Sequence, residues 1–162
     1  MCPGDIIKDK CYTTYVRPIV EYASSVWDPN TQKYINKLEA VQRRAARYVF
    51  SDYQRESSPS SMQLRLGWPT LRARRLQGKA VMMYRIVNNL VAIPENVHLT
   101  RRETSTRGHN ARFLQPNTRV RAYKHSFFPS TIRIWNTLPE ELTQKPSLES
   151  FKLGVAKLDI AA

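Results

Sequence analysis

The sequence predicts a mainly α-helical protein, and three observations support this prediction. Apolar residues recur every three or four positions over several long stretches, which is the spacing of one helix face. Proline and short polar residues stand where these stretches begin, and Gly, Asn or Pro where they end. With 162 residues, of which 41% are hydrophobic, the chain can bury a core without disulfides or a metal. We expect a helical hairpin followed by further helices and an irregular basic segment.

The first helix is predicted to run from Asp5, which can cap it, to Trp27. Pro18 lacks an N–H group and crowds the carbonyl of Thr14, so we expect a kink or a split there. Asp28 and Pro29 end the element. Its apolar positions, three or four residues apart, are Ile7, Cys11, Tyr15, Ile19, Tyr22 and Val26.

The second helix, residues 30–50, is predicted to have a core side and a cationic side. Asn30 or Thr31 can cap its first N–H groups. The core side comprises Tyr34, Ile35, Leu38, Val41, Ala45, Tyr48 and Val49. The adjoining cationic face comprises Lys33, Lys37, Arg43, Arg44 and Arg47. Because a tight turn joins this helix to the first, the two are expected to pack as a helical hairpin.

A polar link over residues 51–61 leads into a short helix, residues 60–66, with Ser58 as cap and Gly67 as stop. The corner Trp68-Pro69 follows. Thr70 can then cap a long helix that runs to about Leu90.

The segment from Val91 to Arg121 has no clean period, although residues 112–114 and 120–123 could be short extended pieces. A helix is predicted over 126–138, and another after Pro146 with Ser147 as its cap. We expect the hairpin, residues 1–52, to pack with residues 53–162 as one unit.

Charge is the strongest functional signal. The net charge is +13 and the pI is near 10.1. Between Lys33 and Lys124 there are 19 Lys or Arg and 5 Asp or Glu, whereas the two ends together hold 7 and 8. The excess therefore belongs to folded elements and not to a basic tail, which favours nucleic acid as the partner.

The predicted contacts are to phosphates, so they are salt-sensitive and independent of base sequence. The alternative is a solvated helical face, but a surface selected only for solubility mixes both signs. Lys79 projects toward the apolar side of its helix, so it either snorkels at the edge or faces a partner. The candidate nucleic-acid-binding residues are Lys33, Lys37, Arg43, Arg44, Arg47, Arg74, Arg75 and Lys79.

No catalytic constellation is found in the sequence. The acidic residues are dispersed, so no carboxylate pair is available for metal-dependent phosphoryl transfer. The five glycines stand far apart, and neither the three histidines nor the two cysteines have metal-ligand spacing. We predict no catalytic residues, no metal site and no cofactor. The three tryptophans are expected to pack in cores or corners rather than to stack on bases.

Several phrases of this sequence, in one order, resemble the reverse transcriptases of non-LTR retrotransposons of the jockey-like kind. The match covers roughly Lys10 to the end of the chain. The matching segments are Tyr15–Pro29, Ile35–Glu39, Val41–Arg47, Leu66–Leu71, Thr106–His109, Ser126–Pro139 and Pro146–Lys152.

The resemblance is to the region after the palm, that is, the thumb and the tail behind it. It implies a fragment of an RNA-directed DNA polymerase without fingers or palm, and therefore without the catalytic aspartates. The hairpin would act like a polymerase thumb that grips a template–primer duplex, with the core side of the second helix packed on Ile7–Val26. The expected location is intracellular, in nucleus or cytoplasm.

Two alternatives stay open. Apolar surface that would face a palm could instead bind the missing palm or another protein, which would make the chain an interaction or assembly module. The chain could also be a decayed retroelement remnant with no selected activity. The partners expected are RNA, DNA or an RNA–DNA hybrid. No membrane partner is expected, since no apolar stretch is long enough to span a bilayer.

Overall fold

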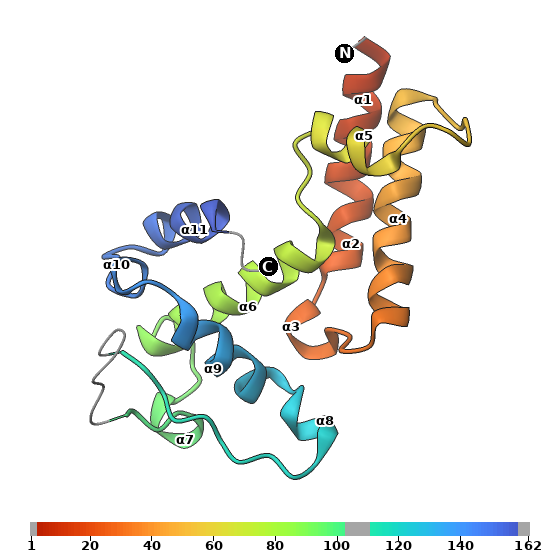
Figure 1. Ribbon diagram of the computed structural model, residues 1–162. Helices are drawn as coiled ribbons and strands as arrows, with labels where there is room; N and C mark the ends of the chain where they lie inside the picture. Colours follow the sequence, from red (N-terminus) through yellow and green to blue (C-terminus); the bar gives the residue numbers. More distant parts are fainter. Residues whose placement is uncertain (1–2, 103–110, 159–162) are drawn as a thin grey trace. The chain divides into compact units, whose positions relative to one another are not determined.

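The computed structural model describes residues 3–102 and 111–158, without the side chains of residues 95 and 96 (Figure 1). The protein is mainly helical, as the sequence predicts. The chain divides into two compact units, residues 1–75 and 76–162. The boundary lies later than the predicted 52/53 division, because the residues up to Arg75 fold with the hairpin.

In the first unit, residues 3–27 form an interrupted helical rod. Its segments are α1 (Pro3–Cys11), the π-helical turn η1 (Tyr12–Val16), α2 (Arg17–Glu21) and α3 (Ser24–Trp27). The irregularity expected at Pro18 lies in the turn before it, where the Arg17 N–H donates to the carbonyl of Tyr12, five residues back. A π turn of this kind changes the hydrogen-bond register next to a residue that cannot donate. Ala23, at φ 50°, then separates α2 from α3.

Helix α4 (Gln32–Phe50) lies alongside α1 in the first unit, and α5 (Pro59–Arg65) packs on α4 (Figure 1). Thr31 occupies the N-cap position, but its hydroxyl makes no capping bond and is buried without a hydrogen-bond partner. The predicted cap is therefore absent. The small core of this unit comprises Tyr12, Ala46, Val49, Met62 and Trp68.

The core face of α4 is rotated away from the predicted one. Gln42, Ala46 and Val49 are buried, whereas Tyr34 and Tyr48, which were assigned to the core side, are about half exposed. Gln42 is tolerated inside because its amide nitrogen donates to the carbonyl of Pro69 at 2.9 Å. The corner Trp68-Pro69 is thus fastened to the middle of α4.

The largest departure from the sequence analysis concerns the first helix. The expectation that its apolar positions pack on the second helix is wrong, because Tyr12 is buried there instead. Tyr15, Ile19, Tyr22 and Val26 are 70–85% exposed, and Ile7 is 65% exposed. We call the exposed row Ile7, Cys11, Tyr15, Ile19, Tyr22 and Val26 the apolar stripe.

Helix α6 (Leu71–Val87) begins in the first unit and continues into the second. The predicted cap is present, since the Thr70 hydroxyl accepts from the Ala73 N–H at 3.1 Å. The other elements of the second unit are α7 (Glu95–His98), α8 (Arg121–Lys124), α9 (Phe127–Thr137), α10 (Glu140–Thr143) and α11 (Leu148–Lys157). Residues 120–123 were expected to be extended, but residues 121–123 belong to the helix α8 and only Val120, its N-cap, is extended.

The second unit is built around Trp135, which is fully buried. Its ring lies 5.9 Å from that of Phe151, which in turn stacks on Tyr84 at 4.5 Å. The predicted Ser147 cap of α11 forms a reciprocal capping box with Ser150. Local capping and the aromatic packing together fix α6, α9 and α11 around one core.

The extended piece predicted at residues 112–114 is held by α9. The side-chain amide of Asn136 accepts from the Phe113 N–H at 3.0 Å and donates to the Phe113 carbonyl at 2.8 Å. Phe113 also forms an antiparallel bridge with Arg101. The Trp135 indole donates to the carbonyl of Ala111 at 2.8 Å. The backbone of this segment is thus satisfied on one side by residues 100–102 and on the other by an amide and an indole of α9.

Candidate nucleic-acid interface

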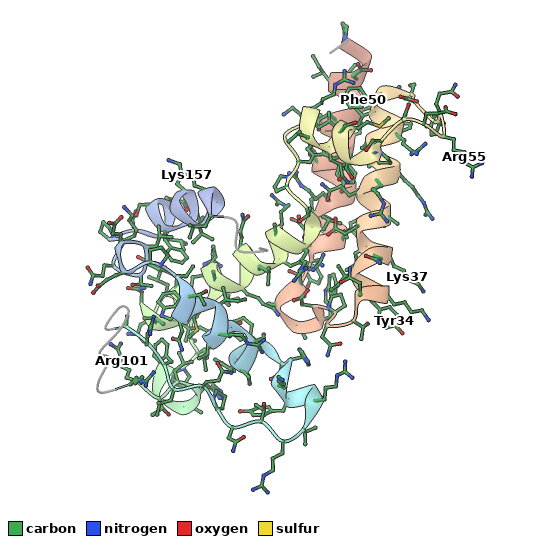
Figure 2. The ribbon with its side chains drawn as sticks, in the orientation of Figure 1. Tyr34, Lys37, Phe50, Arg55, Arg101 and Lys157 are labelled. Atoms are coloured by element: carbon green, nitrogen blue, oxygen red, sulfur yellow. The ribbon has the colours of Figure 1, made fainter. Side chains whose placement is uncertain are left out.

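The cationic face of α4 has three exposed members and two that are partly buried. Lys33, Lys37 and Arg44 are exposed, whereas Arg43 and Arg47 are partly buried. Lys37 lies over the ring of Tyr34 at 5.7 Å, a cation–π contact at the protein surface. Figure 2 shows both side chains extending outward from the first half of α4. Three cations can therefore reach a ligand without any rearrangement of the helix.

Arg47 is committed to the fold. Its guanidinium donates to the carbonyls of Gln54 at 3.1 Å and Ser57 at 3.3 Å, and so closes the loop after α4. In the same loop the pKa of the Asp52 carboxyl is lowered, first by a hydrogen bond from the Ser57 side chain and then by the Gln54 N–H. Arg43 donates more weakly to the carbonyl of Asn36, at 3.3 Å. The guanidinium of Arg47 is therefore used to hold the loop after α4, so Arg47 is a weaker candidate for phosphate binding than the exposed cations.

The only carboxylate of α4, Glu39, is one turn from Arg43 but lies far around the helix from Lys33, Lys37 and Arg44. Its two oxygens accept from the backbone N–H groups of Arg72 at 2.8 Å and Leu71 at 3.3 Å. A carboxylate at the positive end of α6 is stabilised by the helix dipole. Because Glu39 is used there, it does not neutralise the cations on the opposite side of α4.

Arg74 and Arg75 occupy the first turns of α6 and do not join the cationic face. Arg74 pairs with both carboxylate oxygens of Glu21, and this hydrogen-bonded pairing raises the pKa of the guanidinium. Arg75 is buried and pairs with Asp28 at 2.8 Å. We therefore remove Arg75 from the candidate interface, and we assign Arg74 to fastening α6 to α2.

Lys79 is also buried, and its ammonium donates to the Ser130 hydroxyl at 3.2 Å. Lys79 was expected to snorkel at the edge or to face a partner, but it is packed against α9 inside the second unit instead. The structure thus brings together Lys33, Lys37, Arg43, Arg44 and Arg47 on one helix, and it places Arg74, Arg75 and Lys79 elsewhere.

A groove of about 390 Å³ runs beside the cationic face, between α4 and the π-helical turn. The apolar side chains of Tyr15, Val16, Val41 and Tyr48 line it, together with Arg44. Lys8 lies over the Tyr48 ring at 5.3 Å. The sequence analysis missed this groove because it expected Tyr15, Val41 and Tyr48 to be packed between the two helices.

The tryptophans differ in their surroundings. Trp68 is buried against Tyr12 and donates to Asp9, and Trp135 lies in the core of the second unit, so packing is confirmed for these two. Trp27 is 40% exposed and donates to the carbonyl of Tyr22 at 2.6 Å. Its indole nitrogen is therefore not available to a ligand.

Within residues 3–102 and 111–158, no group of three His, Cys, Asp or Glu side chains is placed to hold a metal ion. Among the helices that the structure describes, none is long and apolar enough to cross a membrane. Comparisons with models of protein families, with curated proteins and with solved structures gave no match.

Proposed function

We propose that this protein binds the phosphate backbone of a nucleic-acid duplex through α4, and that it corresponds to the thumb and post-thumb region of a non-LTR retrotransposon reverse transcriptase of the jockey-like kind. The observation that supports this most directly is the segregation of charge on α4. Lys33, Lys37 and Arg44 are exposed on one side, while Glu39 is held on the other by the start of α6. The proposal includes RNA, DNA and hybrid duplexes, since phosphate contacts do not distinguish bases.

The binding is proposed to occur without catalysis. No catalytic residue can be carried over from the resemblance, because the palm carries the paired aspartates in that family. The role of α4 is therefore to hold a duplex. The predicted location, in nucleus or cytoplasm, belongs to the same proposal.

The test replaces Lys33, Lys37 and Arg44 together by Gln and measures binding to a mixed-sequence DNA duplex across a salt series. These three are chosen because changing Arg47 would also release the loop that it closes. Each lost phosphate contact should reduce the slope of log affinity against log salt by roughly 0.9. For the triple variant we expect the salt slope to fall by the amount of about three phosphate contacts. The loss of affinity should be the same for duplexes of other sequences.

The matched control removes three charges from the second unit, with Lys145, Lys152 and Lys157 changed to Gln. Figure 2 shows Lys157 pointing outward from α11. The control has the same net charge as the test variant, so it separates a local contact from general attraction. If the two triple variants had equal salt slopes, the proposal that α4 contacts the phosphate backbone would be wrong.

A second candidate function, binding of a protein partner, is favoured by the apolar stripe. Exposed apolar residues at helical spacing on one rod are unusual for a surface that meets only water. The cations Lys8 and Arg44 lie along the adjoining groove. We propose an amphipathic helix with acidic flanks as the occupant, because it would match both the apolar surface and the charge beside it.

A further inference from the structure

The second unit carries a cationic surface of its own. Between Glu103 and Glu140 the sequence contains no Asp or Glu, although it contains Lys and Arg. These cations are Arg107, Arg112, Arg119, Arg121, Lys124 and Arg133. The other carboxylates of the second unit that the structure describes with side chains belong to α10 and α11, where Glu149 pairs with Lys152 at 2.8 Å. Charge is thus separated along the unit.

Three of these cations lie around His125, which stands where α8 is followed by α9. Arg121 and Lys124 are three residues apart on α8, so they share one side of that helix. Arg133 lies on the row of α9 that begins at Ser126 and passes through Ser130. All three cations are exposed, and His125, partly buried, lies between the two helices. We call Arg121, Lys124, His125 and Arg133 the cationic junction.

The start of α9 adds to the positive potential. Ser126 stands at the N-cap but makes no capping bond, because its hydroxyl donates backward to the carbonyl of Tyr123 at 2.7 Å. The first N–H groups of this helix of 11 residues therefore receive no side-chain cap. Lys79 approaches from α6 through its contact with Ser130. The N-terminal end of the helix dipole and the cationic side chains both make the electrostatic potential positive at this position.

The imidazole of His125 responds to these charges. Its pKa is lowered, first by desolvation and then by Arg121 and Lys124 on α8, Arg133 on α9 and Lys79 on α6. An anion placed among these cations would cancel part of the repulsion and favour the imidazolium. Anion binding and proton uptake by His125 are thus coupled.

We propose that the cationic junction binds a backbone phosphate of nucleic acid, as a second contact surface separate from α4. The inference rests on the class of partner in the proposed function, but it rests on different residues in the other unit. Either surface can therefore fail without the other. Tyr123, half exposed between Arg121 and Lys124 in the sequence, provides an aromatic face on which an unpaired base could stack.

The experiment follows the His125 imidazole of the full chain by NMR while the pH is varied, with and without a mixed-sequence duplex. In the free protein the pKa of His125 should lie below the 6.5 of an unperturbed histidine. With duplex bound, that pKa should rise.

Changing Arg121, Lys124 and Arg133 to Gln should abolish the rise and should reduce the salt slope by roughly 0.9, the value for the loss of one phosphate contact. The variant with Lys145, Lys152 and Lys157 changed to Gln is the control. A second titration with inorganic phosphate distinguishes a site for a free phosphate ion from a site for the phosphate backbone of a duplex. If phosphate shifts His125 and duplex does not, the junction is a small-anion site and the proposal is overturned. An unchanged His125 pKa with both probes also overturns it.

Discussion

Tyr12 has an unsatisfied hydroxyl in the core of the first unit. Its ring packs on Trp68 with centroids 4.5 Å apart, and it is 4% exposed. Its hydroxyl is buried without a hydrogen-bond partner among the described residues. The ring therefore stabilises the unit, whereas the hydroxyl carries a desolvation cost.

Changing Tyr12 to Phe should leave the free energy of unfolding unchanged or raise it by about 1 kcal/mol, since it removes only the unsatisfied group. Tyr12→Ala should lower it by about 3–5 kcal/mol, because the ring is lost as well. Urea denaturation of both variants measures this. The exposed Tyr15→Phe is the control and should have little effect. A clear destabilisation by Tyr12→Phe would contradict the assignment.

The same residue sets part of the alkaline limit of stability. Burial raises the pKa of Tyr12 from 10.0 to about 12, so the neutral phenol is favoured in the folded state. The contribution of the neutral Tyr12 phenol to the free energy of unfolding is fully present below the pKa of the unfolded state, near pH 10. It is lost as the pH rises toward 12. The Tyr12→Phe variant should accordingly lose less stability over this range than the wild type.

At the scale of single elements, two glycines inside helices have opposite surroundings. A Cβ at Gly154 in α11 would overlap Cδ2 of Leu142 on α10, which is buried. A Cβ at Gly78 in α6 would meet nothing within 4 Å. Glycine costs a helix about 1 kcal/mol relative to alanine, so both positions would gain from alanine on propensity alone.

Gly78→Ala should therefore raise the free energy of unfolding by up to about 1 kcal/mol. Gly154→Ala should lower it, because displacing Leu142 costs about 1–3 kcal/mol and outweighs the gain in propensity. Denaturant midpoints of the two variants, compared side by side, test this. Equal stabilisation by both would show that α10 can move away from α11 without cost.

Helix ends and helix faces differ in how far the sequence determines them. The Thr70 and Ser147 caps were predictable, because a cap depends on a hydroxyl and an N–H group three residues further on. The buried face of α4 was not. Apolar residues cover more of its circumference than its partners can bury, so the fold decides which are covered. The short helix α8 was missed because four residues give no periodicity.

The candidate site divides in the same way. The cationic face of α4 was predictable because its five basic residues follow the helical period. The burial of Arg75 and Lys79 was not, because it depends on Asp28 and Ser130, which are 47 and 51 residues away. The sequence shows a run without acidic residues around the cationic junction. Which cations of that run lie close together depends on how α8 and α9 follow one another, and this could not be predicted.

At the scale of the whole molecule, net charge limits what can cover the apolar stripe. Two copies that each carry +13 repel one another, and the repulsion is strongest at low ionic strength. The cations Lys8 and Arg44 lie beside the groove next to the stripe. A second copy is therefore a poor occupant, and an acidic partner is favoured by charge as well as by apolar contact.

Two amphipathic helical peptides that share one apolar face, one with Glu and one with Lys on the polar face, test this directly. The acidic peptide should bind the full chain more tightly, with a preference that declines as salt is added. The double variant Tyr15→Asp, Ile19→Asp should lose binding, because it places charge in the centre of the stripe. Leu64→Asp is the matched control, since Leu64 is 82% exposed but lies on α5. Light scattering of the chain alone completes the test: a dimer that persists at low salt and dissociates in the double variant would make a second copy the occupant.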